Sequence, residues 1–136
     1  MELNEAVDFL RDNHHSVLST RRRDGRPQMS PVVHGVDVDG RVLISTREGA
    51  MKVRNIRRDP NVSLCALPDG FFGAWAQVDG IATVVEMPDA MALLRFVYEQ
   101  VAGPHPDWDE FERDMVAQRR VALSIEISSV GPSVSG

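Results

Sequence analysis

The residues best suited to chemistry lie in a short basic segment, GAMKVRNIRRDP, at residues 49–60. This segment carries one lysine and three arginines, although the whole chain has a formal net charge of -5. Gly49 near its start and Pro60 at its end predict a short helix. The first N–H groups of a helix are unpaired and attract anions. Ser45 and Thr46, which end the preceding extended run, would bring two hydroxyls to the same place.

Lys52, one turn into this helix, would add a full positive charge. A helix end, two hydroxyls and an ammonium group that converge are typical of a phosphate site. The alternative is a solvated helix whose arginines face water and pair with Asp59 or Glu48. Short basic clusters are common on surfaces and mostly bind nothing specific, so composition alone favours this alternative.

A second feature favours a ligand. Phe71, Phe72 and Trp75 stand in one turn before an extended run, and the chain has only eight aromatic residues. Such residues belong to the core, stack on a planar ligand or form a subunit contact, and the sequence leaves these alternatives open. An aromatic wall beside a phosphate site indicates a flat, phosphorylated cofactor.

Other kinds of site find little support. The four histidines lack the spacing of metal ligands, and no serine stands in a nucleophile motif, so we predict no metal site and no catalytic residue of these classes. His34 lies in an apolar run, where a hydrogen-bonded structural role is the more frequent one. The carboxylates after residue 106 are spread along a predicted helix as a solvated face.

Composition predicts one soluble domain over residues 1–136, with 43% hydrophobic and 26% charged residues. The acidic balance argues against nucleic-acid and membrane partners. No apolar run approaches the ~20 residues that span a bilayer. A single cysteine and the lack of a signal-like start indicate the cytoplasm.

Periodicity and turn signals predict the elements. They are a helix over the first dozen residues, strands at 15–20, 28–38 and 41–46, the short basic helix, strands at 61–67 and 74–87, helices at 88–103 and 105–118, a strand at 119–130, and a loose tail at 131–136. Asp24-Gly25 and Asp39-Gly40 predict tight hairpins. We expect Pro31 at a strand edge or bulge, Gly80 at a bulge, and Asp107 as a helix cap.

This pattern indicates a mainly β (α+β) fold, a small antiparallel barrel with short helices at its openings. The chain also resembles the flavin- and deazaflavin-binding split-barrel family related to pyridoxamine 5'-phosphate oxidase, and more narrowly its F₄₂₀H₂-dependent reductases. The resemblance covers most of the chain and rests on GRPQMSPV and KVRNIRRDP at their present spacing.

The resemblance implies a six-stranded split β-barrel that forms a homodimer with two cofactor sites at the interface. Lys52 would hold the cofactor phosphate with Ser45 and Thr46, and Asn55 would cap and shape the helix. The backbone of residues 29–32 would lie against the tricyclic ring. The cofactor-binding residues expected are Met29, Ser30, Pro31, Val32, Ser45, Thr46, Ala50, Met51, Lys52, Arg54, and, from the other subunit, Trp75 and Ala76.

One position departs from the family pattern. Several relatives carry a second basic residue where this chain has Ala50. Either Arg54 or Arg47 would replace that arm, or the phosphate would be held less tightly. Four other arginines would meet the glutamate tail of F₄₂₀: Arg22, Arg23, Arg26 and Arg119.

The implied function is an oxidoreductase that transfers a hydride from reduced F₄₂₀ to an organic acceptor. The alternatives are an FMN-binding pyridoxamine 5'-phosphate oxidase-like enzyme and a non-catalytic F₄₂₀- or flavin-binding protein. No catalytic side chain is expected, because the cofactor carries the reactivity and the protein orients it.

Overall fold

The computed structural model describes residues 1–132, so the end of the expected loose tail lies outside the described residues. Its elements, in chain order, are α1 (Leu3–Asp12), β1 (His15–Arg21), β2 (Pro27–Val36), β3 (Val42–Arg47), α2 (Met51–Arg58), β4 (Asn61–Leu67), β5 (Ala76–Val85), α3 (Ala90–Ala102), α4 (Trp108–Ala117) and β6 (Arg120–Gly131). Every predicted element is present within a few residues of its expected bounds.

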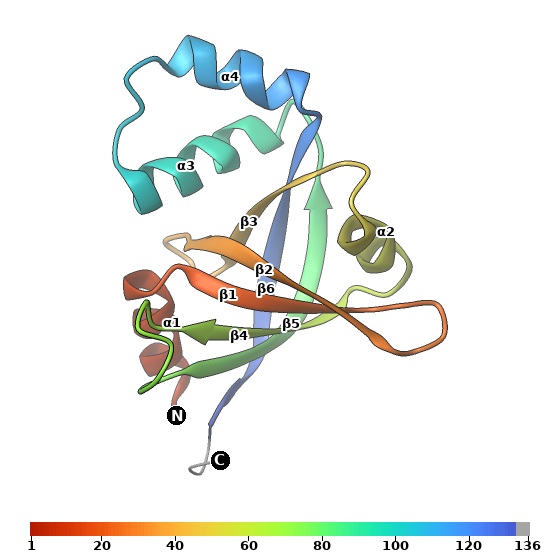
Figure 1. The fold of residues 1–136 in the computed structure, drawn as a ribbon, viewed down its shortest axis with the longest axis vertical. Coiled ribbons are helices and arrows are strands. Elements are labelled where there is room, and N and C mark those ends of the chain that lie inside the picture. Colours follow the sequence, from red (N-terminus) through yellow and green to blue (C-terminus); the bar gives the residue numbers. More distant parts are fainter. Residues whose placement is uncertain (133–136) are drawn as a thin grey trace.

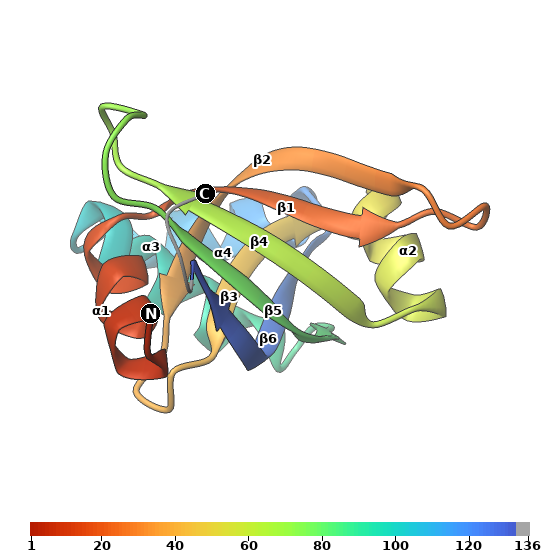
Figure 2. The same cartoon turned by 90° about the horizontal axis from the view of Figure 1, so that it is seen from below.

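The six strands form a closed barrel in the order β1-β2-β3-β6-β5-β4, and every neighbouring pair is antiparallel. Helices α1 and α2 lie at opposite ends of this barrel (Figure 2). Helices α3 and α4 form a separate layer outside it (Figure 1). The expected six-stranded barrel with helices at its openings is therefore confirmed.

The bulge at Gly80 allows the long strand β5 to stay paired along its whole length. The register between β5 and β6 shifts between Asp79 and Gly80. A Cβ at Gly80 would lie 2.4 Å from the carbonyl oxygen of Glu126 and 2.7 Å from Cγ2 of Ile125. The close approach of β6 therefore requires glycine here, and the predicted bulge is confirmed.

Strand β2 is paired on both sides for only part of its length. It pairs with β1 from Pro27 to Val33, but with β3 only from His34 to Val36. Over residues 27–33, the edge of β2 that faces β3 is therefore not paired with β3. Pro31 lies in this stretch, which confirms its expected place at a strand edge.

His34 joins helix α1 to the barrel. Its Nε2–H donates to the carbonyl oxygen of Leu10 at 3.0 Å, and the hydroxyl of Ser16 donates to Nδ1 at 2.6 Å. Both ring nitrogens are used by the neutral imidazole, and the side chain is completely buried. The structural role predicted for His34 is confirmed.

The burial of His34 makes stability depend on pH. Burial lowers the pKa of His34 from 6.5 to about 4. The folded state thus favours the neutral ring. The stability that the neutral ring contributes is fully present above pH 6.5 and is lost as the pH falls toward 4. We expect a loss of roughly 3 kcal/mol in the free energy of unfolding. Urea unfolding at pH 7 and pH 4.5, with His34→Gln as the non-titrating control, measures it, and an NMR titration midpoint near 6.5 would contradict it.

Candidate cofactor site

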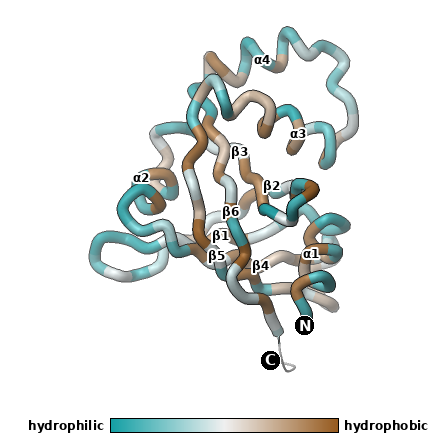
Figure 3. The backbone as a smooth tube through the Cα atoms, turned by 180° about the vertical axis from the view of Figure 1, so that it is seen from behind, coloured by the Kyte–Doolittle hydropathy of each residue, from teal (hydrophilic) through white to brown (hydrophobic). Residues whose placement is uncertain are grey.

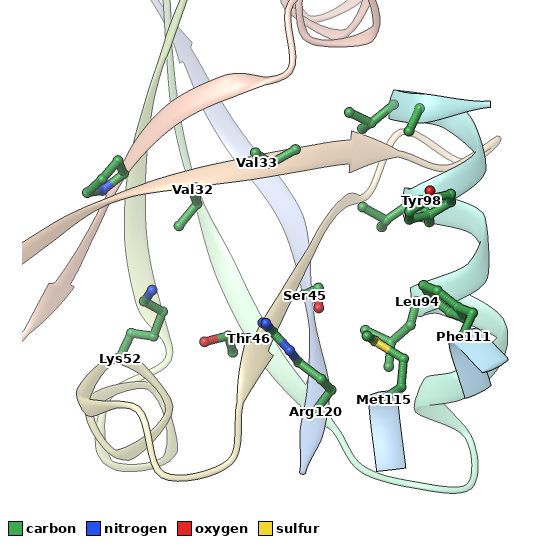
Figure 4. Close-up of a pocket in the computed structure, with 14 residues that line it drawn as sticks. Val32, Val33, Ser45, Thr46, Lys52, Leu94, Tyr98, Phe111, Met115 and Arg120 are labelled. Atoms are coloured by element: carbon green, nitrogen blue, oxygen red, sulfur yellow. The ribbon is translucent and has the colours of Figure 1, made fainter. Parts of the chain in front are cut away.

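The main candidate site is a cleft of about 560 Å³ that opens where β2 separates from β3. Pro31, Val32 and Val33 line it from β2, and Ser45 and Thr46 line it from β3. Helix α2 adds one side chain, β6 adds one, and helices α3 and α4 form the opposite wall (Figure 4).

One end of this cleft is cationic. Lys52 from α2 and Arg120 from β6 both line it, and Thr46 lies between them in the close-up view (Figure 4). Neither cation belongs to an ion pair within residues 1–132. Two cations and a hydroxyl without a carboxylate make a site with the chemistry of an anion receptor.

Both cations of the cleft have a lowered pKa. Burial lowers the pKa of Lys52, and the charge of Arg120 lowers it further. Burial likewise lowers the pKa of Arg120, with a second contribution from Arg47, its cross-strand neighbour. An anion bound between Lys52 and Arg120 would relieve this repulsion, so the charge distribution favours anion binding.

Helix α2 owes its position to its apolar side. Val53 and Ile56 are buried in the barrel core, and the amide of Asn55 donates to the hydroxyl of Thr20 at 3.1 Å. The residue at the N-cap is Ala50, whose side chain makes no capping bond. Asn55 therefore ties the helix to β1. Its expected capping role is wrong, because it lies within the helix and its side-chain amide bonds to the side chains of Thr20 and Arg58.

The other side of α2 lines a second hollow, of about 840 Å³, between α2 and the β1–β2 hairpin. We call it the arginine groove, and its lining residues are Arg22, Arg23, Gln28, Met51, Arg54, Asn55, Arg57 and Arg58. The hairpin and α2 are largely hydrophilic in Figure 3. Arg57 is held by Glu48 at 2.6 Å and by Glu86 at 2.5 Å, whereas Arg22, Arg23 and Arg54 join no ion pair in the described part of the chain.

The structure brings together five of the residues expected to bind a cofactor and separates the others. Pro31, Val32, Ser45, Thr46 and Lys52 share the cleft, whereas Met51 and Arg54 line the arginine groove. Of the two arginines expected to replace the missing basic arm at Ala50, Arg54 lines the arginine groove and Arg47 lines neither hollow, whereas Arg120 lines the cleft. Arg26 and Arg119 line neither hollow.

The remaining expected residues lie outside both hollows. Met29 is 63% exposed on β2, and Ala76 is completely buried at the start of β5, beside the half-buried Trp75. The hydroxyl of Ser30 is buried without a hydrogen-bond partner in residues 1–132, next to the cleft-lining Pro31. Phe71 and Phe72 are not core residues, because 61% and 85% of their surfaces are exposed.

Two parts of the cleft are not among the residues that the sequence predicts for the site. Arg120 lies at the start of β6, and the register of β6 against β3 brings it to the cleft. Leu94, Val97 and Tyr98 lie on α3, and the packing of α3 beside the barrel brings them to the cleft. Both parts of the cleft depend on contacts between segments that are far apart in the sequence, and local sequence patterns do not indicate such contacts.

No helix in the described residues combines the length and apolarity needed to cross a membrane. Within residues 1–132, no three side chains of His, Cys, Asp or Glu are grouped so as to hold a metal ion.

Comparison with known structures identifies proteins of the same fold. A conserved hypothetical protein from Mycobacterium tuberculosis is 26% identical, with a TM-score of 0.79, and the match covers 100% of this chain and 93% of that one. An F₄₂₀ reductase is 20% identical, with a TM-score of 0.70 and coverage of 91% and 94%. A putative pyridoxamine 5'-phosphate oxidase from Listeria innocua is 14% identical, with a TM-score of 0.69 and 95% coverage of both chains.

The family model for pyridoxamine 5'-phosphate oxidase matches residues 3–132, nearly the entire chain. The barrel, the separation of β2 from β3, and the cleft at that separation all lie within the matched region. The chain therefore belongs to the pyridoxamine 5'-phosphate oxidase family, whose split-barrel fold binds flavin-type cofactors.

Proposed function

We propose that this protein is an oxidoreductase that binds the deazaflavin F₄₂₀ and reduces an organic acceptor. One observation carries the proposal: the unpaired edge of β2 faces Lys52, Thr46 and Arg120 across a single cleft. A planar ring requires hydrogen-bonding groups along one side, and its phosphate requires cations. The cleft offers both within reach of one ligand.

The residues of the cleft suit the two parts of such a ligand. Lys52 and Arg120, with the hydroxyls of Ser45 and Thr46, would bind the phosphate. Residues 29–32 would present their backbone to the ring, and the unsatisfied hydroxyl of Ser30 lies in the same stretch. When bound, the deazaflavin supplies the hydride, and the chain binds it, orients it and excludes water.

The arginine groove favours F₄₂₀ over FMN. The F₄₂₀ molecule continues beyond its phosphate as a chain of glutamates, whereas FMN ends at the phosphate. A polyanionic chain requires a second basic surface close to the phosphate site, and the groove lies on the other side of the same helix, α2. Within residues 1–132, Arg22, Arg23 and Arg54 join no ion pair there, so they are available for carboxylates.

We expect the double variant Arg22→Gln/Arg23→Gln to weaken binding of F₄₂₀ with a long glutamate tail by about tenfold, as each lost charge pair at an exposed site is worth up to about 1 kcal/mol. The affinity for a short-tailed F₄₂₀ should fall less, and the affinity for FMN should stay unchanged. Fluorescence titration at low and high salt measures these affinities. Equal losses for FMN and long-tailed F₄₂₀ would contradict a role in tail binding.

The alternatives are an FMN-dependent oxidase-like enzyme and a binding protein without turnover. Parallel titrations of the purified protein with F₄₂₀ and FMN distinguish the two cofactors. Tight binding of FMN alone would overturn the proposal. A reduced cofactor that binds but stays reduced across a panel of acceptors would identify a carrier or sensor.

We further propose that two copies associate and that each completes the other's site. Phe71 and Phe72 stand exposed in an edge-to-face pair on the loop before β5, and Trp75 follows them. Exposed aromatics of this kind are typical of protein contacts. Sedimentation analysis is expected to give a dimer, and Phe72→Asp is expected to shift it toward monomer. The proposed setting is the cytoplasm, with a small-molecule acceptor and without nucleic-acid or membrane partners.

A further inference from the structure

The cleft has a second end that differs in chemistry from the cationic one. Helices α3 and α4 wall it, and the residues facing it there are Leu94, Val97, Tyr98, Val101, Phe111 and Met115. Figure 4 places Leu94, Tyr98, Phe111 and Met115 on this wall, opposite Val33 of β2. Among residues 1–132, Lys52 and Arg120 are the only charged residues that line the cleft, and both belong to the other end.

This helical wall is firmly attached to the barrel. The amide of Gln100 in α3 donates to the carbonyl oxygen of Val36 at 2.8 Å and accepts from its N–H at 2.7 Å. Leu94 and Phe111 pack with Ala90 and Ala122 in a second apolar cluster. The apolar end is therefore preformed, as small-molecule sites usually are.

Tyr98 is the polar exception on this wall. Its ring is enclosed by three rings, those of His105 at 5.0 Å, Phe111 at 5.3 Å and Trp108 at 6.0 Å between centroids. The ring is therefore held in one place, but its hydroxyl has no hydrogen-bond partner in residues 1–132. A phenol both donates and accepts, so a ligand carbonyl would satisfy it.

We propose that the helical end of the cleft binds the acceptor, and that the acceptor is a flat, uncharged, largely apolar carbonyl compound that accepts a hydrogen bond from Tyr98. This rests on the proposed function, because the cofactor occupies the cationic end. A charged acceptor would lose its hydration water on binding, and the side chains of this wall offer no opposite charge to compensate for that loss. In the reduction, the carbonyl carbon would gain one hydride and the oxygen one proton, and the reduced cofactor, which loses this hydride and one proton, would be oxidised by two electrons.

The test uses three matched probes: 9-fluorenone, fluorenone-2-carboxylate, and fluorene, which lacks the carbonyl. Equilibrium dialysis measures their binding to the purified protein with and without saturating oxidised F₄₂₀. We expect fluorenone to bind at least tenfold more tightly than its carboxylate and to bind equally well when F₄₂₀ is present. Tighter binding of the carboxylate, or displacement of fluorenone by F₄₂₀, would overturn the proposal.

Two substitutions locate the probe. Val101→Glu brings a charge to the wall at a site that is already 36% exposed, and it should weaken fluorenone binding at least tenfold. Val116→Glu on α4 is the control, because Val116 is 61% exposed and lies outside the lining, and it should change nothing. Equal effects of the two substitutions would overturn the placement.

Tyr98→Phe tests the hydrogen bond. It should weaken fluorenone binding about fivefold, leave fluorene binding unchanged, and leave the affinity for F₄₂₀ unchanged. An equal effect on fluorenone and fluorene would mean that Tyr98 only packs against the ligand, and it would overturn the proposed hydrogen bond to the carbonyl. The two proposals fail separately. If the protein binds F₄₂₀ but does not bind fluorenone, the acceptor site is refuted. If it binds fluorenone but does not bind F₄₂₀, the proposed cofactor is refuted.

Discussion

Replacing Lys52 by alanine is expected to raise the dissociation constant for F₄₂₀ by about 10- to 100-fold. A hydrogen bond to a charged group contributes about 1.5–3 kcal/mol, and every 1.4 kcal/mol is a factor of about ten. The side chain of Lys52 lines the cleft and has no carboxylate partner in residues 1–132, so its removal leaves no buried charge unpaired. The fold should be unaffected.

The phosphate-free form of the deazaflavin provides the sharpest control for Lys52→Ala. It has no group for Lys52 to bind, so the substitution should leave its affinity unchanged. Arg41→Ala, which removes an exposed cation on the β2–β3 turn, should affect neither ligand. Fluorescence titrations measure all these affinities. An equal loss for both ligands would show that Lys52 shapes the cleft and does not hold the phosphate.

Gly80→Val is expected to destabilise the protein by about 3 kcal/mol or more, in the upper range for overpacked sites. The new Cβ would meet the backbone oxygen of Glu126 at 2.4 Å, and a carbonyl held in the β5–β6 ladder cannot move aside as a flexible side chain would. The two branches of valine add to the conflict. β5 and β6 would have to separate where the barrel closes.

Urea unfolding measures the effect of Gly80→Val. Gly70→Ala is the control, because no atom of residues 1–132 lies within 4 Å of the Cβ it would add, and its effect should stay within about 0.5 kcal/mol. A valine variant as stable as the wild type would mean that the bulge accommodates a side chain. The close approach of β5 and β6 at Gly80 would then contribute nothing to the free energy of unfolding.

Local signals were sufficient for most of the fold. Asp24-Gly25 and Asp39-Gly40 specify tight turns, and both glycines have positive φ angles of 86° and 82°. Asp107 accepts from the backbone N–H of Glu110 at 3.1 Å, as a cap should. Each of these features is encoded within four residues, which is why the sequence predicts it.

The site was predicted less completely, because its members meet through long-range pairing. Lys52 and Thr46 are close in sequence and were identified together. Met51 and Arg54 are just as close, but the turn of the helix directs them to the opposite side of α2. Arg120 reaches the cleft only because β6 pairs with β3, opposite Arg47, and no local pattern indicates that pairing.

The incomplete pairing of β2 also affects how the protein behaves in solution before a ligand binds. A bare strand edge can recruit a strand from another molecule and so begin aggregation. Pro27 and Pro31 lie within this edge, and neither has an N–H to offer an incoming strand. The two prolines keep the edge accessible to a small molecule while they limit its use as a template for another chain.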